Sequence, residues 1–336
     1  MHPPATRLLT LLPGLVLVSG LTVVSYLLAT VPGLTVMGPL VVALVVGLAW
    51  RAVAGLARPV VAGASFSART LLRLGIVLLG VRLDFALLVQ VGPAVLLGSL
   101  LVVSLGIFGI ERLGARLGLS RGLRLGIAVG TGICGASAIL AAVPATRMND
   151  EEAGVSVGII SVLGTLGVIA FALASTIFDL SDSVYGFLVG LTLQEVAQVL
   201  AAGYVPGNEA GDLATIVKLT RVALLAPALL VLSSLLGESG RPKRRGFARL
   251  RVPVPLFLLG FLAVGALNSA GMIPISLANL MQAGSLLLTT MAMVGLGLGI
   301  DLAVFRRVGT SALLVGAVGF VGLVAVMLPY ALLVMP

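Results

Sequence analysis

The stretch GTGICGASAILAAVPATRMNDEE, residues 130–152, determines how the rest of the sequence is interpreted. Glycines recur every four residues up to its start, at Gly122, Gly126 and Gly130, and Gly132 and Gly135 follow. Each glycine costs up to about 1 kcal/mol of helix propensity relative to alanine. Five glycines within fourteen positions therefore predict an interrupted helix inside an apolar segment. The alternative is a continuous helix that packs closely on a neighbour, because small residues let two backbones approach.

The composition is that of a membrane protein with many helical spans. Of the 336 residues, 59% are hydrophobic and only 10% are charged, so the chain cannot cover a soluble domain of this size with charge. Long apolar runs separated by short polar breaks are typical of a polytopic all-α membrane protein. The net charge of +9 comes mainly from Lys and Arg in short loops, which argues against a nucleic-acid partner. With one cysteine, Cys134, and one histidine, His2, the chain cannot form an internal disulfide or most metal- and histidine-dependent catalytic sites.

Apolar runs of about 17–25 residues are long enough to cross a bilayer as helices. Eleven runs are predicted to do so: 8–30, 34–52, 63–81, 87–110, 122–146, 153–178, 183–203, 213–236, 252–268, 276–299 and 309–334. If the N-terminus is cytoplasmic, most loop Arg and Lys residues lie in the cytoplasm, and only Arg82 and Arg147 lie on the opposite side. The positive-inside rule therefore predicts an N-in, C-out chain with eleven crossings.

The chain is interpreted as one integral membrane domain over residues 1–336. Spans one to six occupy residues 8–178, spans seven to eleven occupy 183–334, and a basic loop covers 237–251. We expect this loop to set the orientation of the chain from the cytoplasmic side. A patch that binds lipid phosphates or nucleic acid is the alternative.

Two segments repeat a short pattern. GVRLDFALLVQVG (80–92) and GLGIDLAVFRRVG (297–309) share Gly, a branched apolar residue, Asp, Ala and a final Val-Gly at the same offsets. They close the third and tenth predicted spans, and an odd separation of seven crossings gives them opposite orientations. Inverted repeats of this kind occur in secondary transporters. The alternative is that Gly and Asp simply mark two span ends.

The interrupted fifth span predicts an anion site. Irregular backbone is tolerated at membrane depth only where protein or water buries it, and transporters place substrates at such breaks. If a helix restarts near Gly135, its free N–H groups and positive dipole end face the gap. Hydroxyl groups in the same stretch add further donors. The predicted substrate contacts here are Thr131, Gly132, Cys134, Gly135 and Ser137.

Two further spans carry polar and ionisable residues, which are costly in a membrane and indicate function. Gln194, Glu195 and Gln198 in the seventh span are predicted to share one helical face. Lys218 and Arg221 lie three apart in the eighth span. One cation is expected to pair with Glu195, and the surplus cation then favours an anion. Alternatively, Lys218 or Arg221 reaches the headgroups along its aliphatic stem.

These motifs together resemble a known family. TGICGASAI (131–139), LTLQEVAQVLAAG (191–203), KLTR (218–221) and LLRLGIVLLGVRL (71–83) are similar to the YeiH-like family of sulfate exporters over nearly the whole chain. That family is related to bile-acid, arsenite and cation–proton carriers. The resemblance implies a scaffold domain, a core domain with discontinuous crossing helices, and alternating access. Relatives often carry His at the position of Gln194, so proton coupling here would fall to Glu195 or be absent.

The expected function is therefore secondary active transport of a small anion such as sulfate or a sulfonate, and the resemblance implies that the direction is export. Gln194, Gln198, Lys218 and Arg221 would contact or balance the anion, and Glu195 would couple its movement to Na⁺ or H⁺. No cofactor is expected, the expected location is a prokaryotic inner membrane, and the expected partner is a second copy of the chain in a homodimer. A passive anion channel is the alternative, and an intramembrane enzyme using Ser137 or Cys134 is a third class.

Overall fold

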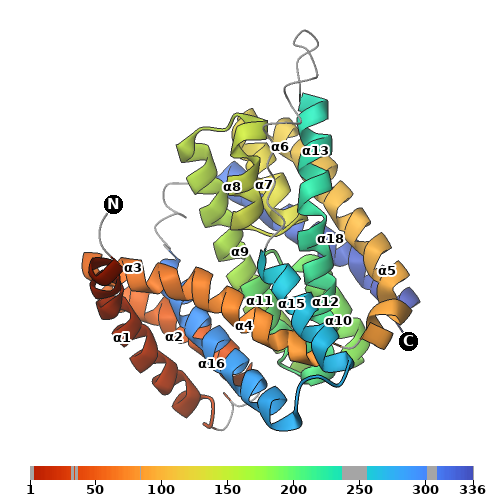
Figure 1. The fold of residues 1–336 in the computed structure, drawn as a ribbon. Coiled ribbons are helices and arrows are strands. Elements are labelled where there is room, and N and C mark those ends of the chain that lie inside the picture. Colours follow the sequence, from red (N-terminus) through yellow and green to blue (C-terminus); the bar gives the residue numbers. More distant parts are fainter. Residues whose placement is uncertain are drawn as a thin grey trace.

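The computed structural model describes residues 4–31, 34, 37–83, 85–236, 256–300 and 309–335, and every regular element in them is a helix. Figure 1 shows their arrangement. The elements are α1 (Pro4–Leu28), α2 (Gly38–Ala54), α3 (Arg58–Phe66), η2 (Ser67–Leu71), α4 (Leu72–Leu79), η3 (Gly80–Arg82), α5 (Phe85–Ser104), η4 (Leu105–Ile110), α6 (Glu111–Arg116), α7 (Arg121–Gly132), α8 (Ala136–Thr146), α9 (Asp150–Ile177), α10 (Asp182–Thr192), α11 (Val196–Gly203), α12 (Asn208–Ala223), α13 (Leu225–Leu236), α15 (Leu256–Ser269), α16 (Ile275–Gly299) and α18 (Thr310–Val334).

Seven helical segments in the described residues are long and apolar enough to cross a membrane. They are Thr10–Leu28, Arg58–Arg82, Val91–Arg116, Glu151–Ile177, Asn208–Leu232, Ile275–Gly299 and Thr310–Val334. Two shorter apolar helices cover Gly38–Ala54 and Leu256–Ser269. The prediction of an all-α chain with several apolar helices of membrane-spanning length is confirmed, whereas the predicted count of eleven is not. The predicted basic loop at 237–251 and most of the second repeat segment, 301–308, lie outside the described residues.

One group of helices, α1 to α4 with α16, lies on the left of Figure 1. Its backbones approach closely at glycines, because a methyl group on Gly47 of α2 would collide with the Val294 carbonyl of α16. Buried hydroxyls fix the same contacts. Ser67 Oγ donates to the Met291 carbonyl at 2.8 Å, and Ser285 Oγ donates to the Gly75 carbonyl at 2.7 Å. Close backbone packing at small residues, together with these hydrogen bonds, therefore holds the helices of this group together.

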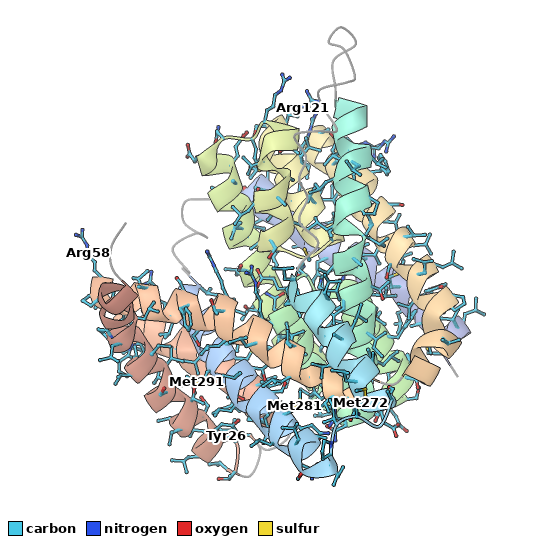
Figure 2. All side chains as sticks on the ribbon, viewed as in Figure 1. Tyr26, Arg58, Arg121, Met272, Met281 and Met291 are labelled. Carbon is cyan, nitrogen blue, oxygen red and sulfur yellow. The ribbon has the colours of Figure 1, made fainter. Side chains whose placement is uncertain are left out.

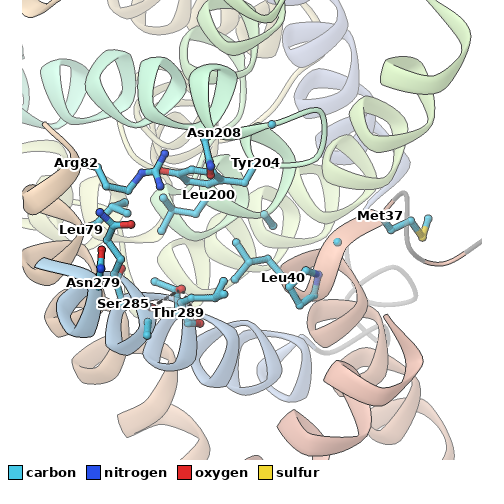
Figure 3. A pocket seen from close by; sticks show the side chains of 17 residues that line it. Met37, Leu40, Leu79, Arg82, Leu200, Tyr204, Asn208, Asn279, Ser285 and Thr289 are labelled. Carbon is cyan, nitrogen blue, oxygen red and sulfur yellow. Dashed lines mark hydrogen bonds between the residues drawn. The ribbon is translucent and has the colours of Figure 1, made fainter. Parts of the chain in front are cut away.

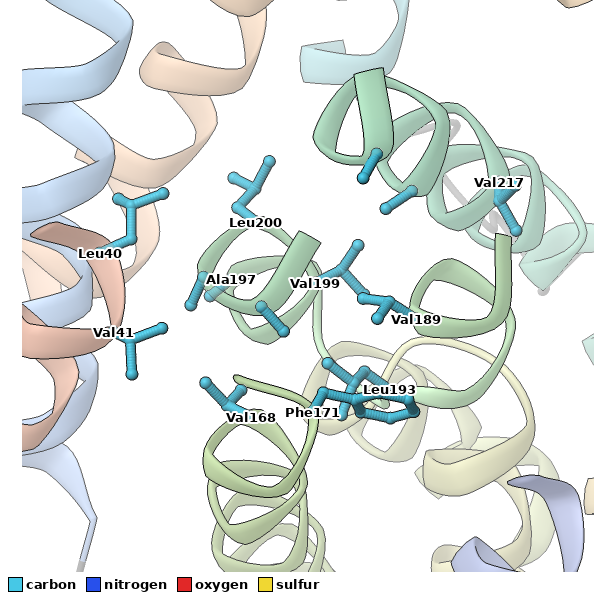
Figure 4. Packing of buried hydrophobic residues seen from close by; sticks show 14 of the residues in the cluster. Leu40, Val41, Val168, Phe171, Val189, Leu193, Ala197, Val199, Leu200 and Val217 are labelled. Atoms are coloured by element: carbon cyan, nitrogen blue, oxygen red, sulfur yellow. The ribbon is translucent and has the colours of Figure 1, made fainter. Parts of the chain in front are cut away.

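The remaining helices form a second group. α18 packs on α5, α9 and α10, and Tyr330 Oη donates to the Ala94 carbonyl at 2.9 Å. α15 lies along α4, where Asn268 Nδ2 donates to the Val81 carbonyl at 2.7 Å. Besides this α15–α4 contact, the two groups meet through α11, which contacts α2 and α16. Figure 4 shows Leu40 and Val41 of α2 facing Ala197 and Leu200 of α11.

Helices α7 and α8 form a hairpin, which we name hairpin A (residues 121–146). A methyl group on Gly122, Gly126 or Gly130 of α7 would collide respectively with Glu152, Ser156 or Ile160 of α9. The constant offset of 30 residues shows that α7 and α9 run parallel, with their first turns adjacent. Since only residues 147–149 separate α8 from α9, α8 must return to the end of the bundle where α7 began.

The first turn of α9 holds the base of hairpin A. The Asn149 side chain accepts from the Glu152 N–H at 2.8 Å, and Glu152 Oε2 accepts from the Asn149 N–H at 3.0 Å. Glu152 also accepts from Ser120 Oγ, which precedes α7. This reciprocal capping box satisfies the first N–H groups of α9 and joins both ends of the hairpin.

Helices α10 and α11 form a second hairpin, hairpin B (residues 182–203). Methyl groups on Gly186 and Gly190 of α10 would collide with the Ala210 and Ala214 carbonyls of α12, again at a constant offset, here 24 residues. α10 and α12 are therefore parallel. Tyr185 Oη donates to the Ala202 carbonyl at 3.0 Å, which ties the start of α10 to the end of α11.

Two sequence-based expectations are thus corrected. The predicted spans 122–146 and 183–203 are each a hairpin that enters and leaves at one end of the bundle, so neither is a single crossing. The prediction failed because two half-length helices inside a membrane need as many apolar residues as one full-length helix, so composition does not distinguish the two. Arg147, expected on the side opposite to Arg121, lies at the same end.

The hairpins also reveal an internal repeat. GTGICGASAILAA (130–142) and GLTLQEVAQVLAA (190–202) share Gly at the start and Leu-Ala-Ala at the end. Between them, apolar residues match at the pairs Ile133/Leu193, Ala136/Val196 and Ile139/Val199. Each segment covers a hairpin tip and its returning arm, followed by a helix parallel to the first arm. Because α9 carries the chain from one end to the other between them, the two hairpins enter from opposite ends.

Candidate functional site

The tip of hairpin A is a three-residue break in the helix. α7 ends at Gly132 and α8 begins at Ala136, and the Gly135 N–H donates to the Gly130 carbonyl at 2.9 Å. Gly135 has φ +70° and ψ −137°, a conformation that side-chain-bearing residues rarely adopt. The predicted interruption near Gly135 is therefore confirmed. The glycines are clustered at this break because the chain reverses direction here, and the turn requires a positive φ at Gly135.

The tip of hairpin B is extended. α10 ends at Thr192, Leu193 has φ −63° and ψ 146°, and Glu195 has φ −106° and ψ 148° before α11 begins. The Glu195 side chain accepts from the Gln198 N–H, and Gln198 Oε1 accepts from the Glu195 N–H at 3.0 Å. The expectation that Gln194, Glu195 and Gln198 share a helical face is wrong, because the first two lie in the break.

Lys218 of α12 joins the two tips. Its side chain is fully buried, and Nζ donates to the carbonyls of Ile133 at 3.0 Å, Leu193 at 2.9 Å and Gln194 at 2.5 Å. An ammonium group has three donors, and all three are used. The Lys218 ammonium group therefore lies in the protein interior and does not extend to the surface along its aliphatic stem.

Arg221, one turn further along α12, joins the same tips through the two arms of its guanidinium. Nη1 donates to the carbonyls of Gly190, Leu191 and Leu193 at 2.7–3.1 Å. Nη2 donates to those of Thr131 and Gly132 at 2.9 and 3.1 Å. The last carbonyls of a helix have no partner within it, and they form the negative end of its dipole. Arg221 and Lys218 supply both the donors and the opposite charge.

Glu195 occupies the complementary position. As well as capping α11, its carboxylate accepts from Ser161 Oγ at 3.0 Å and from the Ala136 N–H at the start of α8. It therefore lies at the positive ends of both returning arms. Among the described residues, neither Lys218 nor Arg221 pairs with Glu195 within 4.0 Å. The expected ion pair is absent because carbonyl groups take its place.

Other predicted site residues are distributed around these charges. Thr131 and Gln194 are fully buried, and Thr131 Oγ1 and both amide atoms of Gln194 have no partner within the described protein. Cys134 is buried. Gln198 Nε2 donates to the Ser161 carbonyl at 3.3 Å. Ser137 is exposed rather than directed into the cluster.

Ser161 was missed by the sequence analysis. It is one of several small polar residues in the mostly apolar sequence of α9. Nothing in its local pattern distinguishes it from a serine whose hydroxyl donates to a carbonyl of its own helix. Only the packing of α9 on hairpin B brings its hydroxyl to the Glu195 carboxylate. Gly164, one turn later, leaves space that the Gln198 side chain fills.

The charges of the site add up to a positive value. Lys218 and Arg221 contribute two positive charges and Glu195 one negative charge. The ends of the half-helices offset each of these locally, since carbonyl ends face the cations and N–H ends face the carboxylate. Glu195, Ala136 and Val196 are partly accessible, whereas Lys218 and Arg221 are not. The accessible side of the site is thus the side of the carboxylate.

Comparison with known proteins places the chain in a family. The model of conserved hypothetical protein 698 matches residues 13–316. A UPF0324 membrane protein of Bacillus cereus is 38% identical over 302 residues, covering 90% of this chain and 85% of the relative. A UPF0324 membrane protein of Pseudomonas aeruginosa is 38% identical over 341 residues, covering 96% and 94%. One of Listeria innocua is 37% identical over 320 residues, covering 95% of each chain.

No solved structure gives a significant match to the chain. The family match and the relatives agree over most of its length, and the relatives are named as membrane proteins of bacteria. The membrane-protein assignment from composition and the apolar helices is thereby supported. The chain belongs to the conserved hypothetical protein 698 family, whose matched relatives carry the name UPF0324 membrane protein.

Proposed function

We propose that the protein is a secondary active transporter that moves a small anion, such as sulfate or a sulfonate, by alternating access. The observation that carries the proposal is the meeting of two helix breaks, Ile133–Gly135 and Leu193–Glu195, around three buried or half-buried charges. Broken helices with their termini directed at one another are the usual means by which transporters bind substrates and ions inside a membrane. A packing role alone does not require polar breaks at that depth.

The proposed topology has nine crossings and two hairpins. The seven long apolar segments and the two shorter apolar helices cross the bilayer, with the N-terminus in the cytoplasm and the C-terminus outside. Hairpin A enters from the cytoplasm and hairpin B from the outer side. Figure 2 shows Arg58 and Arg121 above Tyr26 and Met272, consistent with a cytoplasmic upper side. In this topology Arg147 lies on the cytoplasmic side, and of the two arginines first expected in outer loops only Arg82 stays there. The excess of cytoplasmic Arg and Lys, which the positive-inside rule expects, is therefore larger.

Alternating access would arise between the two helix groups. We assign α1 to α4 with α16 as the scaffold, and the two hairpins with α9 and α12 as the core. Lys218 and Arg221 bond to both hairpin tips, so the tips would move together as one body. α11 contacts the scaffold helices α2 and α16, and this interface would slide or open during transport.

The anion is proposed from the charge balance at the tips. Two cations face one carboxylate at membrane depth, and a surplus positive charge in a medium of low polarity favours an anion. Because the donors of Lys218 are fully used by carbonyls, we propose that the cations attract the anion through their field. Direct contacts would come from the partnerless groups of Thr131 and Gln194 and from the N–H ends near Gly135.

Glu195 is the proposed coupling group, with H⁺ or Na⁺ as the coupling ion and no cofactor. Neutralising its charge would release the N–H ends of α8 and α11 for an anion. Export, location in a prokaryotic inner membrane and the absence of enzymatic activity remain parts of the proposal. A homodimer could form through α1, whose Leu12, Val16 and Leu27 are exposed.

The test is uptake of radiolabelled sulfate and of ethanesulfonate into proteoliposomes, in both orientations, with imposed H⁺ or Na⁺ gradients. We expect saturable uptake, acceleration by unlabelled anion on the opposite face, and loss of gradient dependence in Glu195→Gln. Glu209→Gln, which removes an exposed carboxylate of α12, is the matched control. Uptake without trans-acceleration would instead favour a passive channel. No uptake of either anion by folded protein would refute anion transport.

A further inference from the structure

A second polar region lies at the other end of hairpin B. A cavity of about 560 Å³ opens between the scaffold helices and the turn that joins α11 to α12. Figure 3 shows Arg82, Tyr204 and Asn208 on one side of it, and Asn279, Ser285 and Thr289 on the side formed by α16 and its neighbours. The volume is in the range of pockets that bind small organic molecules.

The lining combines one cation with neutral polar groups and apolar walls. Arg82 is the only charged side chain among the residues that line the cavity in the described structure. Asn208, Asn279 and Gln282 bring amide groups, which donate and accept hydrogen bonds. Leucine side chains from four helices form the walls: Leu40 from α2, Leu79 from α4, Leu200 from α11 and Leu286 from α16.

Arg82 is held in place by Asp212, which does not line the cavity, and by Tyr204, which does. Its Nε and Nη2 donate to the Asp212 carboxylate at 2.8–3.1 Å, and its guanidinium carbon lies 5.8 Å from the centre of the Tyr204 ring. Tyr204 Oη donates to the same carboxylate. A guanidinium is planar with a fixed fork of donors, so these contacts fix which edge faces the cavity.

We propose that this cavity binds an organic anion with an acidic headgroup and an apolar body, such as an alkyl sulfonate or carboxylate. The headgroup would lie at the Nη1 edge of Arg82 and the amides of Asn208 and Gln282. The alkyl part would lie on Leu40, Leu200 and Leu286. The inference rests on the proposed transport function and narrows it, because inorganic sulfate has no apolar part to match these walls.

The place of the cavity agrees with a substrate role. Leu200 and Tyr204 belong to hairpin B or its end, whereas Leu40, Leu79 and Leu286 belong to the scaffold group. A ligand here would contact both bodies that are proposed to move. The returning arm α11 that lines the cavity starts directly after Glu195, so binding and the coupling group share one helix.

The experiment measures binding directly, without transport. Purified protein in detergent is titrated with 1-butanesulfonate, butanoate and sulfate by isothermal titration calorimetry. We expect saturable binding of the two organic anions and at least tenfold weaker binding of sulfate. Leu286→Trp should fill the cavity and weaken butanesulfonate binding at least tenfold. Leu287→Trp, at an exposed neighbour that does not line the cavity, should leave it unchanged.

A second pair of variants tests the headgroup. Arg82→Gln combined with Asp212→Asn removes both charges together, so that no unpaired carboxylate remains, and butanesulfonate binding should fall about tenfold. Equal affinity for sulfate and butanesulfonate, or wild-type binding by Leu286→Trp, would overturn the cavity assignment. These outcomes leave transport untouched, since sulfate uptake can persist. Conversely, cavity-dependent binding without any uptake would establish the binding site and refute the transporter.

Discussion

Glu195 of hairpin B packs against Gly135 of hairpin A, so closely that a methyl group on Gly135 would lie 2.5 Å from Glu195 Cγ. One tip provides a carboxylate, and the other provides a backbone without a side chain to receive it. The two positions are equivalent in the internal repeat, sixty residues apart. The two halves of the repeat share the order helix, break, helix, but they differ at this position in side chain and in backbone conformation. A single carboxylate therefore serves both helix starts.

Gly135→Ala should damage this contact. The new methyl group would displace the Glu195 side chain, and alanine would also be strained at φ +70°. The matched control is Gly118→Ala, at φ +74° with nothing within 4 Å, which should cost only the backbone strain of about 1–2 kcal/mol. We expect a larger fall in melting temperature and lost anion uptake for Gly135→Ala, and normal uptake for Gly118→Ala. Equal effects of the two variants would show that the contact is unimportant.

Arg221→Lys should not be conservative. The guanidinium reaches carbonyls of both tips with separate nitrogens, whereas an ammonium is a single point with three donors. Each buried carbonyl left without a donor costs about 1–3 kcal/mol. We expect a clear loss of thermal stability in detergent and loss of uptake. Arg112→Lys, at an exposed arginine, is the control and should match wild type, and the prediction fails if Arg221→Lys does too.

Gln194→Leu separates a structural role from a ligand-binding role. Both amide atoms of Gln194 are buried without a protein partner, and burying such groups is unfavourable. Leucine should therefore preserve or raise the melting temperature. If the amide contacts the anion, as proposed, uptake should fall at the same time. A variant that is stable and fully active would remove Gln194 from the site.

The hairpin topology can be tested by labelling. In a Cys134→Ala background, Arg121→Cys and Arg147→Cys place thiols at exposed positions on either side of hairpin A. A membrane-impermeant maleimide should label both in inverted vesicles and neither in right-side-out vesicles. Ser181→Cys and Pro206→Cys, which flank hairpin B, should show the opposite pattern. Labelling of Arg121→Cys and Arg147→Cys from different sides would restore a full crossing over 122–146.

From the sequence alone follow the all-α, membrane class of the protein, the position of one helix break, and most of the residues that the structure brings together at the two tips. Long apolar runs specify helices in a membrane because lipid offers no partners to the backbone. The glycines before Gly135 predicted the first break, and the cost of burying charge singled out Glu195, Lys218 and Arg221. The second break has no such signal, since LTLQEVA (191–197) contains no glycine or proline.

The path of the chain and the partners of the charged side chains follow only from the packing of the helices. A run of about twenty-five apolar residues has the same composition as a span or as a hairpin of two half-length helices. The hairpin is distinguished from a span by the contacts of Gly122, Gly126 and Gly130 with the first turns of α9, which make α7 and α9 parallel. Likewise, Lys218 and Arg221 meet carbonyls rather than Glu195 because two hairpins from opposite ends bring their helix ends together beside α12. Such contacts join segments that are 24–90 residues apart in sequence, beyond the reach of any local pattern.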